Sequence, residues 1–487
     1  MKDVRDVIVV GGGNAGLISA LIFQASFPKI KLRVIRSSNI GTIGVGESST
    51  EHFGDFCEYC GIPKLDMILK AKATFKNGVY FDGWSDAPFL NNVNFNSTQA
   101  EIGSHFPYMQ SVVANNRPNY EINYCGSWVH QFPLVSFRNL NDSPTNQFHF
   151  DTLALNQYLQ TTCELRGIQI IEDEIYDASI DSETGDISSV IGNNTYESDF
   201  FIDCSGFSRL LVGKKLGIKW KSYSEYLPLN SAIAFTTDEM EEYNVYTKAT
   251  ARNYGWSWQI PTQDKTGNGY VFCDRFIDED QAHQEMESVY GEELNVAKTF
   301  KFDPGRLEKA WHKNCYAVGL SQSFVEPLEA TSIGSVIRQM FSFTHYFPSY
   351  SIDDCNESVN HIFDNIFDYV QAHYLVKRED TPFWKEIKND LKIKPSLQKL
   401  LDVWEKRFPL AQDIVCKWGM FTELNYIPIL YGLKWFDQKS VSEQYKNISD
   451  IPILNWEQSY KSDILYVGHK NIIKEIVRIS NLNRKKY

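Results

Sequence analysis

The sequence predicts an α/β protein that combines a Rossmann-like dinucleotide-binding domain with a second, mostly helical domain. Two observations support this prediction. The chain opens with an apolar strand, a glycine-rich turn and an apolar helix in that order, which is the arrangement of a dinucleotide-binding unit. From about residue 335 onward, apolar residues instead recur at helical spacing. The first feature places a nucleotide near the N-terminus, and the second assigns the C-terminal part to helices.

Length and composition describe a large folded protein. The 487 residues are 43% hydrophobic and 14% aromatic, which suits two or three packed units. The net charge of -13 argues against nucleic acid as the main partner, because phosphate binding needs concentrated Lys and Arg. No apolar run approaches the roughly 20 residues of a membrane helix, and the first strand begins too early to leave room for a signal peptide. We expect a soluble, cytoplasmic protein with no membrane partner.

The nine cysteines are scattered and odd in number, as is typical of reduced thiols. Cys57 and Cys60 form the one CxxC pair. No second pair or matching histidines accompany it, so we expect no metal site.

The first strand, helix and second strand form one βαβ unit. Residues 7–10 are the buried strand, residues 11–16 read GGGNAG, and residues 17–23 begin the helix. Glycines there let a pyrophosphate approach the helix N-terminus. Residues 32–35 form the next strand, and Arg36 follows where an acid usually holds a ribose hydroxyl. An arginine at this place also suits the 2′-phosphate of NADP, so a nicotinamide cofactor stays an alternative.

Further elements follow from local patterns. Residues 41–50 are rich in glycine and hydroxyls, and they suit either a cofactor-wrapping segment or a plain loop. A helix capped by Asp151 or Thr152 should run to about Leu165. The other expected strands are 168–171 and 188–191, joined through the polar turn 181–185, then 200–202 and 315–319. A later apolar stripe contains Ile362, Ile366, Tyr369 and Val370.

Trp256 and Trp258 lie two residues apart in the run WSWQIP. On a strand such positions point to the same face. The pair therefore forms either core mass or one wall of a passage.

Seven separated motifs resemble the flavin-dependent halogenases of the tryptophan halogenase family. They occur in the family's order over about residues 1–345, and the resemblance thins across the C-terminal third. The motifs are GGGNAG, GTIGVGES at 41–48, TFKNGVYFDGW at 74–84, FHFD at 148–151, FIDCSGF at 201–207, WSWQIP at 256–261 and FVEPLEATSI at 324–333.

The resemblance implies a particular domain arrangement. The FAD-binding domain would be like that of group A flavin monooxygenases. Residues 1–345 would form this core, with substrate-domain segments interleaved at about 75–150 and 215–300. Residues 346–487 would be a mostly helical part of the substrate domain.

The resemblance also implies the chemistry. FADH2 from a separate flavin reductase, O2 and a halide ion would give hypohalous acid, which travels through the protein to a small aromatic substrate. Lys76 matches the family's lysine, which either hydrogen-bonds this oxidant or becomes a haloamine. Glu329 matches the carboxylate that stabilises the arenium intermediate and removes its proton. Without the motifs around them, Lys76 would be interpreted as an ordinary surface lysine, and Glu329 as a cap of the following helix.

Further residues receive expected roles by the same resemblance. Thr331 and Ser332 would hold the halide through backbone amides, although the family often has glycine at the second position. Trp256 and Trp258 would separate flavin from substrate, and His105 and Phe106 fall near substrate-stacking positions or in the core. The expected cofactor-binding residues are Gly11, Gly13, Asn14, Ala15, Gly16, Arg36, Ile43, Glu47, Ser48, Leu320 and Ile333.

Two departures from the family pattern leave alternatives open. Arg36 replaces the acid that many of these enzymes use on the ribose. The region including residues 418–435 has no clear match to the residues that grip free tryptophan. An indole, another electron-rich aromatic or a carrier-bound group is the expected substrate, and homo-oligomer formation stays open. A flavin monooxygenase and a non-catalytic FAD-binding protein are the rival readings.

Overall fold

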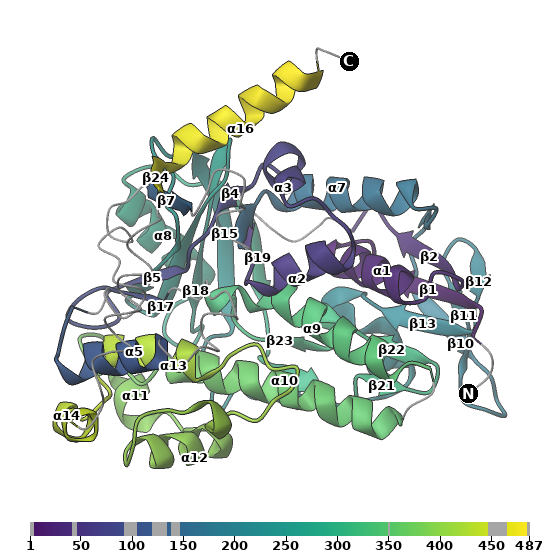
Figure 1. The fold of residues 1–487 in the computed structure, drawn as a ribbon. Coiled ribbons are helices and arrows are strands. Elements are labelled where there is room, and N and C mark those ends of the chain that lie inside the picture. The colour runs from purple at the N-terminus through teal and green to yellow at the C-terminus, as the bar shows by residue number, and fades with distance from the viewer. Residues whose placement is uncertain are drawn as a thin grey trace.

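The computed structural model describes residues 4–40, 46–91, 105–118, 134–137, 147–348, 351–446 and 465–484. A six-stranded sheet carries the glycine-rich turn, with the order β21-β22-β13-β1-β2-β9 (Figure 1). All neighbours are parallel except β21 and β22. The strands are β1 (Asp6–Val10), β2 (Lys31–Arg36), β9 (Gln169–Glu172), β13 (Phe200–Asp203), β21 (Trp311–His312) and β22 (Cys315–Ala317).

Both faces of this sheet are covered, which explains its continuous apolar strands. On one face α1 (Asn14–Ser26) packs against α7 (Thr152–Leu165) and α9 (Thr331–Tyr346). On the other face Ile8 and Phe201 share a core with a small sheet, β10-β11-β12. Its strands are Asp177–Ile180, Ile187–Ile191 and Thr195–Glu197, and the irregular helices η2 (Gly206–Ser208) and η3 (Leu210–Lys215) follow β13.

A seven-stranded sheet forms the second layer of the fold, in the order β19-β15-β18-β17-β16-β5-β6. All neighbours are antiparallel except β16 and β5. Helix α8 (Glu279–Tyr290) packs on β15 and β18. The strands are β5 (Val79–Asp82), β6 (Phe89–Asn91), β15 (Ser231–Asp238), β16 (Thr247–Arg252), β17 (Gly255–Pro261), β18 (Lys265–Phe272) and β19 (Val296–Lys301).

Three smaller sheets pair strands that come from distant segments of the chain. Sheet β3-β8-β4 joins Glu47–Ser48, Phe148–Phe150 and Thr74–Phe75. Sheet β14-β20-β23 joins Trp220–Ser222, Gly305–Leu307 and Ser323–Phe324, and β24 (Leu465–Gly468) pairs with β7 (Leu134–Phe137).

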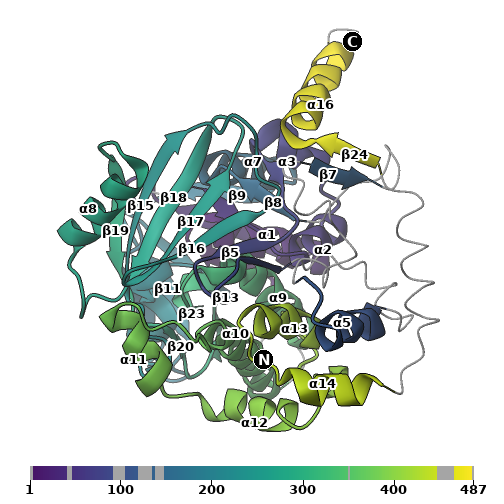
Figure 2. The same cartoon turned by 90° about the vertical axis from the view of Figure 1, so that its left-hand side faces the viewer.

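The C-terminal part is helical, and in both views its helices gather beside the large sheet (Figures 1 and 2). Helix α16 extends away from the body at the C-terminal end. The helices are α10 (Ile352–Ala372), α11 (Pro382–Asp390), α12 (Pro395–Trp404), η6 (Ala411–Asp413), α13 (Glu423–Gly432), α14 (Gln438–Tyr445) and α16 (His469–Arg484). The remaining ones are α2 (His52–Tyr59), α3 (Leu65–Lys70), α5 (His105–Ala114), η4 (Gly319–Ser321) and η5 (Leu328–Ala330).

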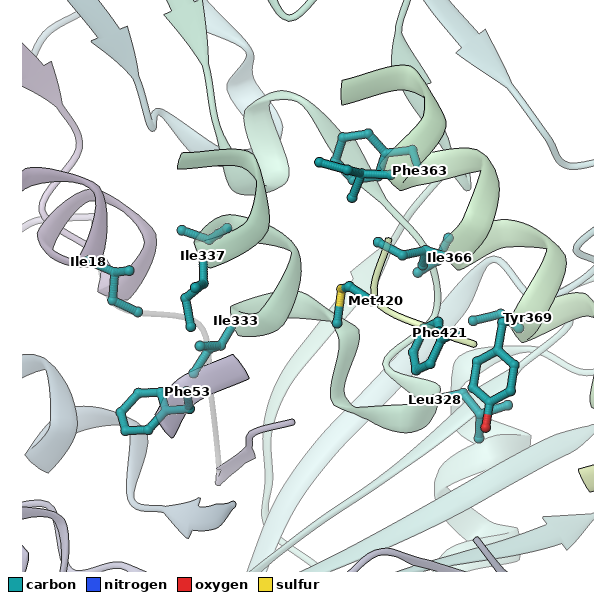
Figure 3. Close-up of a cluster of buried hydrophobic side chains, with 14 of the residues drawn as sticks. Ile18, Phe53, Leu328, Ile333, Ile337, Phe363, Ile366, Tyr369, Met420 and Phe421 are labelled. Atoms are coloured by element: carbon teal, nitrogen blue, oxygen red, sulfur yellow. The ribbon is translucent and has the colours of Figure 1, made fainter. Parts of the chain in front are cut away.

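Helix α9 is fixed from two sides by apolar side chains (Figure 3). Ile333 and Ile337 lie on the side of Ile18 and Phe53, and Met420 lies on the opposite side toward α10. A methyl group added to Gly334 would come within 2.4 Å of Cε of Met420, so the contact there is close. The first turns of α9 are therefore packed on two sides.

The expected α/β fold is present, and the C-terminal part is helical as predicted. Asp151 caps α7 by accepting a hydrogen bond from the amide of Ala154 at 2.8 Å. Two expectations need correction. The second domain is expected to be mostly helical, but the segments 75–150 and 215–300 contribute the strands of the seven-stranded sheet. Some of these strands pair as local hairpins, as β16 does with β17 and β17 with β18, whereas β16 also pairs with β5 from a distant part of the chain, which periodicity does not show. The turn 181–185 joins β10, which the sequence reading missed, to β11.

Candidate functional site

The glycine-rich turn after β1 shows why glycines are required there. Gly11 has φ of 120°, and an added Cβ would lie 2.2 Å from the carbonyl oxygen of Cys204. An added Cβ on Gly16 would lie 1.9 Å from the Gly11 carbonyl oxygen, so α1 packs directly on the turn. A Cβ on Gly13 would meet no atom within 4 Å. The N-terminus of α1 is therefore open at Gly13 and suited to a pyrophosphate.

A cavity of about 560 Å³ begins at this turn and reaches Glu329. It brings together residues from the six-stranded sheet, the large sheet and the start of α9. Among the predicted site residues, its lining includes Gly11, Gly13, Asn14, Ala15, Arg36, Glu47, Ser48, Trp256, Trp258, Leu320, Glu329 and Ser332.

Three predicted cofactor or halide residues lie elsewhere. Gly16 packs under the turn, as described above. Thr331 is buried, and Ile333 belongs to the apolar cluster around α9. Neither appears in the cavity lining. That the backbone of Thr331 contacts the halide and that of Ile333 the cofactor stays a prediction.

Some predicted residues cannot be judged from the structure. Ile43 lies outside the described residues, together with the rest of residues 41–45. His105 and Phe106 begin α5, but their side chains are not among those described. Their substrate-stacking role stays a prediction.

Arg36 lies at the edge of the cavity beside the glycine-rich turn. Its guanidinium hydrogen-bonds the side chain of Gln160, and its Nε lies 3.5 Å from a carboxylate oxygen of Glu172. An added Cβ on Gly12 would lie 2.4 Å from Cβ of Arg36. The arginine charge is thus already balanced by the protein, which does not favour a dedicated 2′-phosphate site.

Glu47 is a buried acid beside the same turn. Its carboxylate accepts a hydrogen bond from Nδ2 of Asn14 at 3.2 Å. Burial raises the pKa of Glu47 to about 7, and the Asn14 bond opposes this rise. The residue is therefore close to half protonated near neutral pH.

Trp256 and Trp258 point to the same face of β17, as strand alternation predicts. Both rings line the cavity, with centroids 6.1 Å apart. Ser257 between them points the other way and accepts a hydrogen bond from Nε of Arg252 at 2.8 Å. An added Cβ on Gly269 would lie 2.1 Å from the Trp258 ring, so this glycine makes room for it. Trp256 and Trp258 are therefore part of the hydrophobic core and also form a wall of the cavity.

Lys76 follows the short strand β4 and is buried, with 2% of its surface exposed. Its ammonium donates a hydrogen bond to the carbonyl oxygen of Ser49 at 2.8 Å. Burial lowers the pKa of Lys76 to about 8, although the negative charges of Glu329 and Glu51 oppose this change. Near pH 8 both its ammonium and its amine are populated.

Glu329 projects from a strained turn into the cavity. Glu329 and Ala330 have φ of 63° and 57°, the left-handed region that non-glycine residues rarely adopt. Such strain is found mainly where the surrounding structure fixes it for function. Nδ2 of Asn91 donates to Oε1 of Glu329 at 2.8 Å, and the Tyr369 hydroxyl donates to the same oxygen at 3.3 Å.

The turn is followed directly by α9, whose first residues are Thr331 and Ser332. No side chain caps this helix N-terminus, and its first turn has no acid. Amides at such a position attract anions. Ser332 lines the cavity, so the site suits a halide next to a cofactor.

A family model described as tryptophan halogenase matches residues 6–448 of this chain. The chain belongs to the tryptophan halogenase family. It is a flavin-dependent halogenase by family, and family membership implies FAD as the cofactor.

Several tryptophan halogenases and their structural relatives are similar over almost the full length. The 7-chloro-L-tryptophan 6-halogenase KtzR of Kutzneria sp. is 27% identical, and the alignment covers 88% of this chain and 90% of the relative. The tryptophan 7-halogenase RebH of Lentzea aerocolonigenes is 28% identical, and the alignment covers 88% of this chain and 89% of the relative.

Solved halogenase structures have the same fold. The tryptophan C-6 halogenase Tar14 from taromycin biosynthesis matches with a TM-score of 0.83 and 27% identity, covering 97% of this chain and 100% of the other. The flavin-dependent halogenase Xcc4156 from Xanthomonas campestris matches with a TM-score of 0.81 and 25% identity, covering 97% and 98%.

The sequence reading missed the partners of Glu329. Asn91 ends a three-residue strand and carries no motif. Tyr369 was assigned to an apolar stripe on α10, and His373, one turn further, belongs to the same stripe. The sequence signal that could have indicated a partner for Glu329 is His373, a histidine at the end of an otherwise apolar helix face. The described residues contain no group of three or more potential metal ligands, and no described helix is long and apolar enough to span a bilayer.

Proposed function

We propose that this halogenase uses reduced FAD, O2 and a halide ion to halogenate an indole or another electron-rich aromatic. One observation carries the proposal. A single cavity runs from the glycine-rich turn to Glu329, and the buried Lys76 interacts electrostatically with that carboxylate.

The chain's own residues suit the binding of FAD and halide. Gly11 and Gly13 open the α1 N-terminus to a pyrophosphate, and Leu320 and Trp258 line the cavity beyond it. Reduced FAD, when bound, would supply the oxidation of halide by O2 to hypohalous acid. The halide would be held by the amides of Thr331 and Ser332 at the α9 N-terminus.

Lys76 would direct the oxidant toward the substrate. Its ammonium holds hypohalous acid by donating a hydrogen bond, or its amine takes the halogen. In the second case an N–halogen bond forms as the O–halogen bond breaks, and the oxygen leaves as water with a proton from the nitrogen. With a pKa of about 8, both forms are available near neutral pH. Burial also keeps bulk water from consuming the oxidant.

Glu329 would complete the substitution. Its carboxylate stabilises the cationic arenium ring and then takes the proton from the carbon that carries the halogen. The C–H bond breaks, its electron pair restores the aromatic ring, and an O–H bond forms on the carboxylate.

The Trp256–Trp258 wall would keep the organic substrate away from the flavin. This arrangement favours halogenation over direct oxygenation by a flavin monooxygenase. A separate flavin reductase would supply FADH2. Free tryptophan is not the expected substrate, although the named relatives KtzR and RebH act on tryptophans, as their names state.

The test is a product screen with reduced flavin, O2 and chloride, bromide or iodide. Indoles, tryptophan and phenols are offered, and products are identified by mass spectrometry. A halogenated arene is expected, whereas an exclusively oxygenated arene contradicts the proposal.

Two variants separate the steps. Lys76→Ala and Glu329→Gln should still oxidise halide, detected with a chemical trap, but lose arene halogenation by about a hundredfold or more. Lys72→Ala and Glu326→Gln are matched controls four and three residues away, and both should keep the product. Equal product yields from all four variants would remove Lys76 and Glu329 from these roles, and a wild type that forms no product would indicate an FAD-binding protein without this chemistry.

A further inference from the structure

His373 lies directly after α10 and contacts two acceptor groups. Its Nδ1 lies 2.9 Å from the carbonyl oxygen of Tyr369, and its Nε2 lies 3.2 Å from Oε1 of Glu329. Both side chains of the pair are almost completely buried, with 1% and 4% of the side-chain surface exposed. Water therefore does not separate or screen the two side chains.

The two contacts together require an extra proton. A backbone carbonyl can only accept, so Nδ1 of His373 must carry a hydrogen. In a neutral imidazole Nε2 would then be a bare acceptor facing an acceptor oxygen of Glu329. The short contact is favourable only if a proton lies between Nε2 and Oε1.

The surroundings indicate which partner holds that proton. Oε1 of Glu329 also accepts from Asn91 and Tyr369, and three donors on one oxygen suit a carboxylate. Nδ2 of Asn91 donates to the Tyr369 hydroxyl at 2.7 Å, which fixes the direction of that hydrogen-bond chain. His373 lies at the C-terminal end of α10, where the helix dipole favours a positive charge.

We propose that His373 is a positioning residue that stays an imidazolium and forms a buried ion pair with Glu329. The rings of Phe81 and Trp84 pack near the imidazole. The titratable groups that face the pair are Tyr369 and Lys76, and Glu51 and Tyr426 interact with these two.

The pair has a consequence for the reaction, and this part rests on the proposed function. Among the described residues, the hydrogen bonds to Glu329 from Asn91, Tyr369 and His373 all end on Oε1. Oε2 is therefore the oxygen that takes the arenium proton. His373 keeps the carboxylate ionised and its second oxygen oriented.

The protonation state can be measured without substrate or flavin. Protein labelled with ¹⁵N-histidine is observed by NMR at pH 7.5, where a free imidazole is mostly neutral. The His373→Gln variant identifies the His373 signals, and His361→Gln, an exposed position on the same helix, should leave them in place. We expect both ring nitrogens of His373 to be protonated, and Glu329→Gln to convert the ring to the neutral form.

A neutral His373 ring in the wild-type protein would overturn the proposal, whatever the activity. The consequence for the reaction has its own readout. His373→Gln keeps a hydrogen-bond donor but loses the charge, so arene halogenation per trapped hypohalous acid should fall about tenfold or more. Its yield should also change with pH differently from that of the wild type. An unchanged yield and pH profile would remove the positioning role, and a wild type that halogenates no arene would contradict the proposed function alone.

Discussion

The ammonium of Lys76 donates a hydrogen bond to the backbone carbonyl of Ser49 across 2.8 Å of protein interior. Both ends of this contact are fixed by the same small sheet. The Lys76 amide donates to Gln147, and Ser49 exchanges two hydrogen bonds of 2.9 Å with Phe148. Burying a cation is costly, which points to a function that needs it.

We expect Lys76→Met to stabilise the protein at neutral pH. The pKa of Lys76 falls from 10.5 to about 8 on folding, which corresponds to a destabilisation of roughly 3 kcal/mol. The sign follows from proton binding: between pH 8 and 10.5 the unfolded chain binds more protons, so wild-type stability rises with pH. The advantage of the variant is therefore full below pH 8 and shrinks through this window. Urea unfolding at pH 7 and pH 10 measures it.

Lys72→Met is the matched control for this prediction. Lys72 is exposed and forms an ion pair with Asp264. Its removal should change stability by no more than about 1 kcal/mol and in the destabilising direction. A Lys76→Met variant no more stable than this control would contradict the burial argument.

Glu326 should be protonated at neutral pH. Burial raises its pKa from 4.5 to about 8, and the Tyr374 hydroxyl donates to its carboxyl oxygens at 2.6 and 2.8 Å. Because the folded state binds more protons between pH 4.5 and 8, this group's contribution is present below pH 4.5 and is lost as pH rises through 8. We expect Glu326→Gln to flatten the stability profile from pH 5 to 8.5 by about 4 kcal/mol.

Glu357→Gln, at an exposed position on α10, provides the comparison for Glu326. Its profile should follow that of the wild type. If Glu326→Gln also follows the wild type, the buried acid is not protonated as described.

Trp256→Phe combined with Trp258→Phe should weaken the proposed wall between the flavin and the substrate. We expect a loss of roughly 1–3 kcal/mol in unfolding free energy for the lost ring volume. The product mixture should gain oxygenated arene or lose coupling between halide oxidation and halogenation. Trp84→Phe, a buried neighbour whose ring lies 6.4 Å from that of Trp256, should cost similar stability and leave the products unchanged. Identical products from both proteins would assign the pair to the core alone.

Gly11→Ala should abolish FAD binding, measured by flavin fluorescence. The added Cβ would overlap the Cys204 carbonyl at 2.2 Å, so the turn must move. Gly13→Ala meets no atom within 4 Å and should keep the wild-type unfolding midpoint. Normal FAD affinity in Gly11→Ala would place the cofactor elsewhere.

Local patterns predicted much of the fold. Strand β1, the glycine-rich turn and helix α1 follow from consecutive residues, and the capping of α7 by Asp151 follows from one side chain. The family motifs also indicated Lys76 and Glu329. Both are buried, Glu329 lines the cavity and Lys76 interacts electrostatically with Glu329, and their roles stay predictions.

Strand alternation alone determined that Trp256 and Trp258 share a face, and the order of strand, turn and helix alone predicted a nucleotide site, which stays a prediction. Only the tertiary structure decided what surrounds Glu329. Asn91 comes from a strand 238 residues earlier, and His373 comes from a helix end 44 residues later. Periodicity reports which side of an element is apolar. It cannot report which distant elements meet, because that depends on long-range strand pairing and helix packing.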